Sequence, residues 1–560
     1  MNKSFLFGFC CLLLFSCKTE KVKGVIAENA MVVSAREEVS EIGNIILKKG
    51  GNAFDAMAGI ELALAVAYPY AGSLGGGGFM VYRLEDGRIG SLDFREKAPL
   101  AATKNMYIDS ITDQVIPNKS TLGSMAVGIP GNIAGIYASH GKYGKLAMEE
   151  IIAPVIELAK KGVVVTKKQQ ERLEKYRETF LKVNNPNFLF AKDWKATDTI
   201  KRLQLAKTLE RIQKNGRDEF YKGETAQKLV DFMQKSGGIM TMEDLAKYEA
   251  KWRTPITFTY DDLRVISMSP PSSGGICLAE IMKAIEPYDL AELGHNTTKA
   301  IQLITEAERR AYADRNHFLG DPDFVTIPTE TLLSEKYIKE RMSTFSFEKA
   351  TPSSEVAHGN IEFVESDETT HYSIVDSFGN AVSVTTTING AYGSKLYCEE
   401  LGFFLNNEMD DFSAKPGVPN MFGLVGAEAN SIAPEKRMLS SMTPTIVEKD
   451  GKLYIVVGTP GGSTIITSVL QTILNVHEYK MGMQEAINQP RFHHQWLPDT
   501  VKMEPKGFSD ELKATLTKLG YTIDATNSPV IGKVEGILVL PDGKLEGGAD
   551  PRGDDKAVGY

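Results

Sequence analysis

The sequence predicts an α+β protein in which two helical layers enclose two β-sheets. Segments with helical and with strand-like periodicity follow one another in blocks: helices over 31–70, a hairpin within 72–99, helices over 140–345, and a strand-rich part from Thr369 onward. The chain has 560 residues, of which 42% are hydrophobic, so it can bury a large core. Helices and sheets each have an apolar face to cover, and blocks in this order fit helices packed outside sheets.

The first seventeen residues form a leader that is excluded from the fold. One Lys precedes an apolar stretch over Phe5–Phe15, which is too short to span a bilayer as a helix and ends at a polar run, as in a secretory signal. The end of the stretch, Leu14–Cys17, resembles the bacterial lipobox, in which the Cys is lipidated and becomes the mature N-terminus. Because Phe15 is bulky for that motif, plain cleavage without a lipid is the alternative. We expect an exported protein of the periplasm or cell envelope, lipid-anchored at Cys17.

Charge and cysteine usage argue against several classes of protein. The net charge is −9 and no Lys/Arg run occurs, which argues against a nucleic-acid partner. Cys10 and Cys11 leave with the signal and Cys17 would be capped, so only Cys277 and Cys398 remain, too few for a disulfide framework and without the CxxC spacing of a zinc site. The adjacent His493 and His494 would point apart on a strand. The sequence therefore predicts neither a metal nor an organic cofactor.

The N-terminal part combines a buried helix with a glycine-rich hairpin. The stretch "GGNAFDAMAGIELALAVAYP" (50–69) is apolar on nearly all sides, which predicts a buried helix. Four glycines at 75–78 lack the GxGxxG spacing and the Lys-Ser/Thr pair of nucleotide loops, and they indicate backbones in close approach. Asp86-Gly87 predicts the turn of a hairpin whose second strand ends at Arg95 and Glu96.

The middle of the chain is mainly helical by periodicity. A Pro/Ser/Gly-rich loop at Ser267–Gly275 leads into a helix, and a polar connector at Ser343–Glu368 has no core-facing pattern, which predicts an exposed and flexible segment. The clearest predicted helices are Met148–Lys161, Gln169–Thr179, Glu224–Ser236 and Thr298–Phe318.

The C-terminal part is rich in strands. A hairpin is predicted from strands His371–Asp376 and Ala381–Ile388 around a turn at 377–380. Further on, "LYIVVGTPGGS" predicts a strand that runs into a Gly turn, "TIITSVLQTILNVHEY" a helix, and "GILVLPDGKLEGGADPR" a late hairpin with an Asp-Gly turn.

Two adjacent threonines stand where the acidic connector meets the first hairpin strand. Such a pair is ordinarily structural, because Thr favours strands. A cut between Glu368 and Thr369 would instead give Thr369 a free α-amine, whose unperturbed pKa of about 7.7–8.0 suits a base for its own hydroxyl. In the register that pairs 369 with 387, Thr387 is within side-chain reach and Asn389 is close by, whereas the other register turns both away.

Motifs on both sides of Thr369 resemble, in order, those of the γ-glutamyltransferase family. The resemblance runs from about Val32 to Tyr560. It implies an N-terminal nucleophile hydrolase fold, an αββα four-layer sandwich, made as a precursor that cleaves itself into a large subunit, 18–368, and a small subunit, 369–560, which form a heterodimer. The motifs are "LDFREKAP", "GIPGNIAGI", "PPSSGGI", "YADRNHFLGDPDF", "TTHYSIVDSFGNAVSVTTTING", "NNEMDDFSAKPGVPN", "KRMLSSMTPTIV", "GTPGGSTIITSVLQ", "PRFHHQWLPD" and "ADPRGDDKAVGY".

The resemblance implies a role for individual residues. Thr369 matches the nucleophile of both self-cleavage and turnover, and Thr387 matches the threonine that hydrogen-bonds to it. Arg95 matches the arginine that binds the substrate α-carboxylate, for which a bidentate fork is suited. The other matches are Ser440 and Ser441 as further carboxylate ligands, Asn389, Glu408 and Asp411 as acceptors of the α-ammonium, and Gly461 and Gly462 as the oxyanion hole.

Three positions refine this assignment. Glu408 stands where some members carry Gln. The segment Ala414–Glu428 matches a lid loop over the glutamyl pocket, and Phe422 replaces a Tyr that many lid-bearing members carry, so closure by packing without that hydrogen bond is expected. His371 follows the nucleophile by two residues and is predicted to be structural, because the α-amine already fills the base role.

The predicted function is a self-processing γ-glutamyltransferase and glutathione hydrolase. It would pass the γ-glutamyl group of glutathione or a related amide to water or to an amino acid or dipeptide through a Thr acyl-enzyme. A cephalosporin acylase or a poly-γ-glutamate depolymerase is the nearest alternative; Arg95, Glu408 and Asp411 favour a donor with a free α-amino acid end. A surface lipoprotein that only binds peptides or amino acids is a further alternative, which the intact nucleophile and oxyanion-hole residues disfavour.

Overall fold

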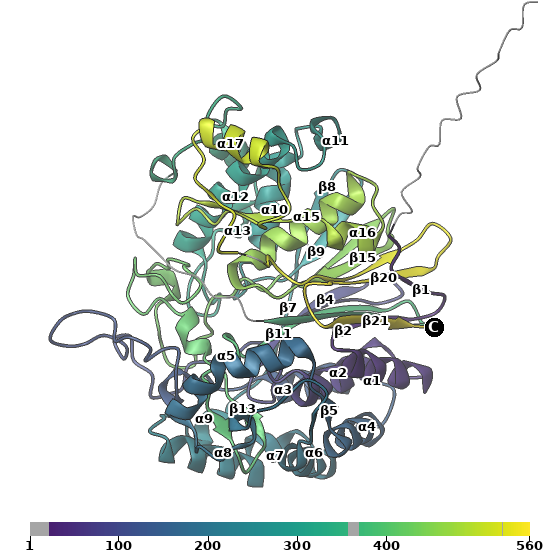
Figure 1. The fold of residues 1–560 in the computed structure, drawn as a ribbon, viewed down its shortest axis with the longest axis vertical. Helices are drawn as coiled ribbons and strands as arrows, with labels where there is room; N and C mark the ends of the chain where they lie inside the picture. Colours follow the sequence, from purple (N-terminus) through teal and green to yellow (C-terminus); the bar gives the residue numbers. More distant parts are fainter. Residues whose placement is uncertain (1–21, 357–368, 529) are drawn as a thin grey trace, which may run out of the picture.

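The computed structural model describes residues 22–356, 369–528 and 530–560. In this part of the chain two β-sheets lie face to face, and helices cover the outer side of each (Figure 1). This is the four-layer αββα sandwich that the sequence predicts. The leader with Cys17 and the acidic end of the connector, 357–368, lie outside the described residues.

One sheet carries the hairpin that begins with the predicted nucleophile. Within the described residues it has seven antiparallel strands in the order β21-β2-β10-β11-β3-β4-β7, so β10 and β11 are near its centre. The strands are β21 (Asp555–Gly559), β2 (Met31–Ala35), β10 (Thr370–Val375), β11 (Ala381–Thr387), β3 (Gly77–Arg83), β4 (Ile89–Phe94) and β7 (Lys251–Arg253).

The second sheet carries the Gly turn that contains the predicted oxyanion hole. Its described strands are also seven and antiparallel, in the order β1-β20-β19-β15-β14-β9-β8. They are β1 (Val25–Ala27), β20 (Leu545–Ala549), β19 (Glu535–Val539), β15 (Lys452–Gly458), β14 (Thr445–Lys449), β9 (Leu263–Ser267) and β8 (Ile256–Tyr260). Apolar side chains from both sheets, such as Val81 and Val456, form the core between them.

Helices of the N-terminal half cover the first sheet. The best buried is α2 (Ala53–Ala67), all of whose residues are buried, as the sequence predicts, and whose start is fixed by a capping box between Asn52 and Asp55. The others in this layer are α1 (Glu37–Lys48), α3 (Asn132–Tyr143), α4 (Met148–Lys161), α5 (Lys167–Val183), α6 (Leu203–Asn215), α7 (Arg217–Tyr221), α8 (Glu224–Lys235) and α9 (Met242–Ala246).

Helices from both halves of the chain cover the second sheet. Helix α12 packs on α10, and α10 packs on α15, which follows the Gly turn (Figure 1). The helices of this layer are α10 (Gly274–Ile285), α11 (Leu290–Leu293), α12 (Thr298–Phe318), α13 (Thr329–Leu332), α14 (Glu335–Met342), α15 (Ile465–His477), α16 (Met483–Asn488) and α17 (Asp510–Lys518).

Three expectations about local structure are corrected. The start of the predicted helical block, Met31–Ala35, is strand β2, which is paired on both edges and buried along its length. Strands β8 and β9 interrupt the helical middle. The described part of the connector is not fully exposed, because Ser353 is buried and its hydroxyl donates to the carbonyl of Trp496 at 2.6 Å.

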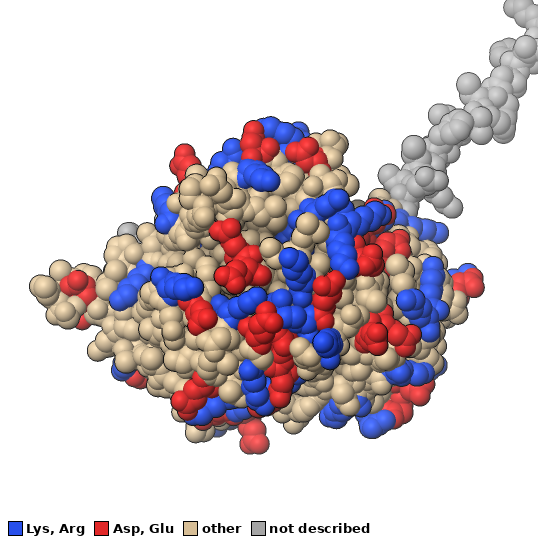
Figure 2. Space-filling model, turned by 90° about the horizontal axis from the view of Figure 1, so that it is seen from below, with Lys and Arg blue, Asp and Glu red and all other residues tan. Residues whose placement is uncertain are grey.

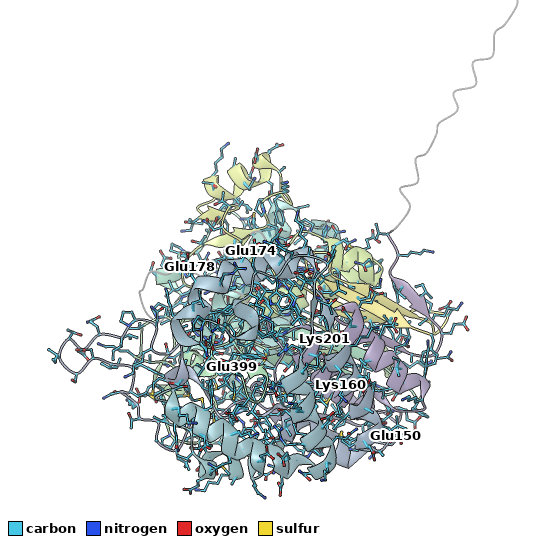
Figure 3. The ribbon with its side chains drawn as sticks, turned by 60° about the horizontal axis from the view of Figure 1, so that its bottom comes forward. Glu150, Lys160, Glu174, Glu178, Lys201 and Glu399 are labelled. Carbon is cyan, nitrogen blue, oxygen red and sulfur yellow. The ribbon has the colours of Figure 1, made fainter. Side chains whose placement is uncertain are left out.

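The surface carries charges of both signs. Lys and Arg side chains alternate with Asp and Glu over the face seen from below (Figure 2). On the outer helices, exposed side chains such as Lys160 of α4 and Glu174 of α5 extend into solvent (Figure 3). None of the helices in the described residues is long and apolar enough to cross a membrane.

Candidate active site

The hairpin register places the two predicted catalytic threonines opposite each other. Thr370 of β10 faces Thr386 of β11, so Thr369, one residue earlier, lies opposite Thr387. The sequence is compatible with two hairpin registers, and in the observed one the side chains of both threonines point to the same face of the sheet. Both residues are buried, and both line one pocket.

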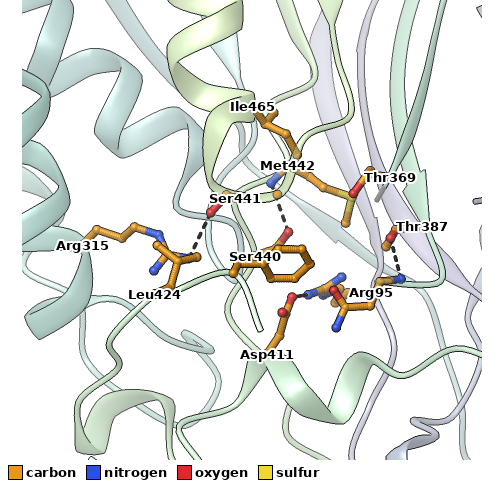
Figure 4. A pocket seen from close by; sticks show the side chains of 13 residues that line it. Arg95, Arg315, Thr369, Thr387, Asp411, Leu424, Ser440, Ser441, Met442 and Ile465 are labelled. Atoms are coloured by element: carbon orange, nitrogen blue, oxygen red, sulfur yellow. Dashed lines mark hydrogen bonds and ion pairs between the residues drawn. The ribbon is translucent and has the colours of Figure 1, made fainter. Parts of the chain in front are cut away.

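The pocket lies between the two sheets at the start of the hairpin (Figure 4). Its cavity volume is only about 20 Å³ in this structure, far below the size range of small-molecule sites, so the site is nearly filled by its own side chains. It brings together most of the residues predicted from the sequence; Glu408 and Gly461 are not part of its wall. The lining residues are Arg95, Arg315, Thr369, Thr387, Asn389, Asp411, Phe422, Leu424, Ser440, Ser441, Met442, Gly462 and Ile465.

Arg95 follows strand β4 and is enclosed by carboxylates. Its Nη1 lies 2.6 Å from Oε2 of Glu408, its Nη2 pairs with Asp411, and its Nη1 is 3.9 Å from Glu96. Glu408 and Asp411 reach it together because they are the first and last residues of one 3₁₀ turn. The predicted cation site and anion site are therefore adjacent, and in this structure they pair with each other.

Burial sets the protonation of this cluster. Burial and then the neighbouring Asp411 raise the pKa of Glu408 to about 8, although Arg95 opposes the shift. Burial also raises the pKa of Asp411, again against Arg95, and it raises that of Glu96 well above its usual range. Glu408 is thus protonated at neutral pH to a large extent, and a protonated Glu resembles the Gln that some family members carry.

Replacing Glu408 by Gln is expected to flatten the pH dependence of stability. The folded state binds this proton more tightly than the unfolded state, so the wild type loses stability as the pH rises from about 4.5 to about 8. The variant has no such proton to lose. As the pH increases through this range, the free energy of unfolding of the variant minus that of the wild type should increase by up to about 1.4 kcal/mol per pH unit.

Chemical denaturation of both proteins at several pH values measures this difference. Glu399→Gln, which changes an exposed carboxylate (Figure 3), is the matched control and should leave the pH dependence unchanged. A constant difference between Glu408→Gln and the wild type would mean that Glu408 is ionised throughout this range.

The two predicted serine ligands are held by different elements: Ser440 by the Pro/Ser/Gly-rich loop before α10, and Ser441 by an arginine of α12. The carbonyl of Ser440 accepts from Ser273 Oγ at 2.7 Å, and the Ser440 N–H donates to Pro271 at 2.9 Å. Ser441 Oγ accepts from Nη2 of Arg315 at 3.0 Å. Sequence reasoning missed Arg315, although it lies within the motif "YADRNHFLGDPDF", because a lone arginine in a helix carries no signal of its own.

The glycine pair has a backbone that other residues rarely adopt. Gly461 has φ +138° and Gly462 has φ +54°, just before the 3₁₀ turn Gly462–Thr464 that leads into α15. A Cβ on Gly462 would lie only 2.6 Å from the ring of Phe422. Because Gly462 has no side chain, its backbone and the lid residue Phe422 can both lie against the pocket. This arrangement suits an oxyanion hole, in which N–H groups must come close to the reacting carbonyl.

Asn389 connects the nucleophile hairpin with the acidic turn. Its φ of +67° is a conformation that Asn tolerates better than most residues. Its N–H donates to Thr387 Oγ1 at 2.7 Å, and its side chain donates to the carbonyl of Asn407 at 3.0 Å. Asn389 therefore fixes Thr387 relative to the turn that carries Glu408.

The predicted lid, Ala414–Glu428, covers the pocket. Phe422 lines the pocket and is buried, and its ring packs against Gly462, so closure by packing occurs as expected. The lid is tied down beside the ring, because Met421 N–H donates to Asp410 Oδ2 at 2.9 Å. Asp410, which the family resemblance did not select, thus acts as an anchor of the lid.

The histidines near the site have structural surroundings. His371 is buried between Thr385 Oγ1 at 3.0 Å and Ser373 Oγ at 3.1 Å, and burial lowers its pKa to about 3. His493 contacts Thr467 Oγ1 through Nδ1 at 2.9 Å, whereas His494 contacts Asp499 through Nε2 at 3.2 Å. The two adjacent histidines thus have separate partners.

Comparisons with known proteins agree with this fold. A family model described as gamma-glutamyltranspeptidase matches residues 39–560. The chain is 46% identical over 543 residues to the glutathione hydrolase proenzyme of Escherichia coli strain K12, covering 96% of this chain and 93% of that protein.

Solved structures give the same result. The crystal structure of Helicobacter pylori gamma-glutamyltranspeptidase is 41% identical with a TM-score of 0.56, covering 60% of this chain and 96% of that chain. A cephalosporin acylase from Bacillus halodurans shares the fold at 23% identity, with a TM-score of 0.86 over 100% of this chain and 99% of that one. The predicted fold and enzyme class are confirmed, and the chain belongs to the γ-glutamyltranspeptidase family.

Proposed function

We propose that this protein is a self-processing γ-glutamyltransferase and glutathione hydrolase with Thr369 as its nucleophile. The observation that carries the proposal is the composition of one pocket. Thr369 and Thr387 lie on its wall together with a buried arginine, Arg95, and a partly buried carboxylate, Asp411. A γ-glutamyl group differs from other acyl groups by its zwitterionic α-carbon, and a cation beside an anion is the recognition that this carbon requires.

The proposed maturation divides the chain between Glu368 and Thr369. The Thr369 hydroxyl attacks the carbonyl of Glu368, the peptide nitrogen leaves as the α-amine of Thr369, and water hydrolyses the resulting ester. The products are a large subunit that ends at Glu368 and a small subunit, 369–560, which stay together as a heterodimer because strands β10 and β11 pair with β2 and β3 of the large subunit.

In the proposed turnover the new α-amine takes the proton of the Thr369 hydroxyl, which then attacks the γ-carbonyl of the donor. Backbone N–H groups of Gly461 and Gly462 stabilise the oxyanion. The leaving amine takes the proton and departs, so the γ-glutamyl group remains as an ester on Thr369. Water or the amine of an acceptor then attacks that ester, which releases the product and restores the hydroxyl.

The charged residues of the pocket favour a γ-glutamyl donor over the donors of a cephalosporin acylase or a poly-γ-glutamate depolymerase. An acyl group without a free α-amino acid end would leave Arg95 and Asp411 with no zwitterion to bind. The lid residue Phe422 narrows the same pocket, which suits a short donor better than an internal unit of a polymer. A protein that only binds peptides would not need a nucleophile opposite Thr387.

The proposed activity is tested by the release of a chromophore from a γ-glutamyl anilide. The purified protein should release it without added metal, and a dipeptide acceptor should increase the rate by accelerating attack on the ester. Glutathione should compete with the anilide. No release from the processed protein would refute the proposed activity.

Export with a lipid on Cys17 belongs to the same proposal and rests on the leader sequence. The stretch Leu14–Cys17 closes the apolar run, and firm anchoring needs two or more acyl chains. Metabolic labelling with a fatty acid should mark the wild type and not Cys17→Ala, and membrane fractionation should follow the label. A wild type that is unlabelled and freely soluble would leave plain signal cleavage as the explanation.

A further inference from the structure

Arg315 is a buried cation on the wall of the pocket that holds Thr369. It comes from the C-terminal part of α12, in the outer helical layer, and is 3% exposed. Figure 4 shows its guanidinium reaching toward Ser441, one of the two predicted carboxylate ligands.

The surroundings of Arg315 differ from those of other buried arginines on the same helix. Its hydrogen bonds within the described residues end on neutral oxygens: Ser273 Oγ at 3.0 Å, Asn316 Oδ1 at 3.1 Å and Ser441 Oγ at 3.0 Å. Arg310, by contrast, pairs with Glu306 at 2.6 Å. In the described part of the chain no carboxylate lies within ion-pair distance of Arg315. Because burying an unpaired cation is costly, an anion that enters this pocket gains from its charge.

Arg315 also determines the direction in which Ser441 can donate. A serine hydroxyl has one proton to donate. Since Ser441 Oγ already accepts from Arg315, its own proton is available for another acceptor, and Ser441 lines the pocket. Ser440 is in the same situation, because its Oγ accepts from the N–H of Met442 at 3.1 Å. Both hydroxyls can therefore act as donors toward a carboxylate.

We propose that Arg315 is a positioning residue for the α-carboxylate of the donor. Arg315 orients the Ser441 hydroxyl so that it can donate to the carboxylate. It also adds positive charge to the site, because the charge of Arg95 is shared with Glu408 and Asp411. The inference rests on the proposed γ-glutamyl function and adds a second cation to its carboxylate site. A purely structural clamp between Ser273 and Ser441 is the competing explanation.

Three anilide substrates separate these two roles. The γ-glutamyl anilide carries both charges, the glutaryl anilide keeps the carboxylate and lacks the ammonium, and the 4-aminobutyryl anilide keeps the ammonium and lacks the carboxylate. In Arg315→Met, kcat/KM should fall about ten- to a hundred-fold for the two carboxylate-bearing substrates, mainly through KM, because a charge-assisted hydrogen bond is lost. For the 4-aminobutyryl anilide it should stay within about two-fold.

Further variants keep the test informative if Arg315→Met is poorly folded. Arg315→Lys retains the charge and loses the fork, and it should show a smaller loss on the same two substrates. Ser441→Ala and Arg315→Met should be non-additive, since Arg315 acts through Ser441. Arg310→Met removes a buried arginine from the same helix without touching the pocket, so it should lower stability and leave the ratios among the substrates unchanged.

If kcat/KM fell by the same factor for all three substrates in both Arg315 variants, Arg315 would not position the carboxylate. It would then be a structural clamp between Ser273 and Ser441. A wild type that turns over none of the three would refute the proposed function itself. A wild type that prefers the γ-glutamyl anilide, combined with equal losses in the variants, would refute only the role of Arg315.

Discussion

Thr369→Ala is expected to yield one uncut chain without γ-glutamyl activity. The same hydroxyl serves both reactions, so its removal should stop self-cleavage and should lower turnover by roughly 10⁴-fold or more, as removal of a nucleophile does in other acyl-transfer enzymes. Denaturing electrophoresis should show two bands for the wild type without added protease. Sequencing of the smaller fragment should begin with Thr-Thr-His-Tyr.

Two neighbouring variants make this test specific. Thr369→Ser keeps a hydroxyl and an α-amine and should still be cut. Thr370→Ala changes the next residue, whose side chain points to the other face of β10 and does not line the pocket. It should still be cut at the same bond. A wild-type fragment that starts at Thr370, or efficient cleavage of Thr369→Ala, would show that Thr369 is not the nucleophile.

Periodicity predicted the long elements well and the short strands badly. Helices α4 and α12 begin and end at the predicted residues; α4 presents one apolar face to the core, whereas α12 is buried on all sides over most of its length. Strand β2 has five residues that are all buried, so it lacks the alternation that distinguishes a strand from a helix. Strands β8 and β9 were missed despite a usable signal: β8 shows partial alternation of exposed and buried residues, and Asp261 marks the turn.

Some features of the site were likewise predictable from the sequence and others were not. Family motifs identified the pocket residues individually, because each motif carries its own residue types in order. The hairpin register, which decides whether Thr387 faces Thr369, depends on the pairing of whole strands and needed the structure. Arg315 was not predictable, since its importance arises from the lack of a carboxylate partner among the described residues and from a contact with Ser441, 126 positions away in the chain.

Asp411→Asn is expected to weaken γ-glutamyl substrates strongly and glutaryl substrates little or not at all. In this structure Asp411 pairs with Arg95. In the proposed mode of binding, the carboxylate of a zwitterionic donor takes the place of Asp411 at Arg95, and its ammonium takes the place of Arg95 at Asp411. Both charges keep a partner in that exchange, so the net cost of desolvation is small.

Removal of Asp411 breaks one half of this exchange. The donor ammonium would then keep Asn389 and the largely protonated Glu408 but lose its charged partner, which typically costs on the order of 2–5 kcal/mol, or roughly thirty- to several-thousand-fold in binding. A glutaryl substrate has no ammonium, and Arg95 would be freer to bind its carboxylate. The ratio of kcat/KM values for the γ-glutamyl and glutaryl anilides should therefore fall sharply in Asp411→Asn.

The adjacent carboxylate provides the matched control for this prediction. Asp410 accepts from Ser120 Oγ at 2.6 Å and from the lid, and it does not line the pocket. Asp410→Asn should loosen the lid and lower turnover of both anilides by a similar factor, with the ratio preserved. Arg95→Lys should lose activity on both, because a point charge cannot replace a bidentate fork. If Asp411→Asn behaved like Asp410→Asn, Asp411 would be a structural residue, and the assignment of a γ-glutamyl donor would lose its main physical support.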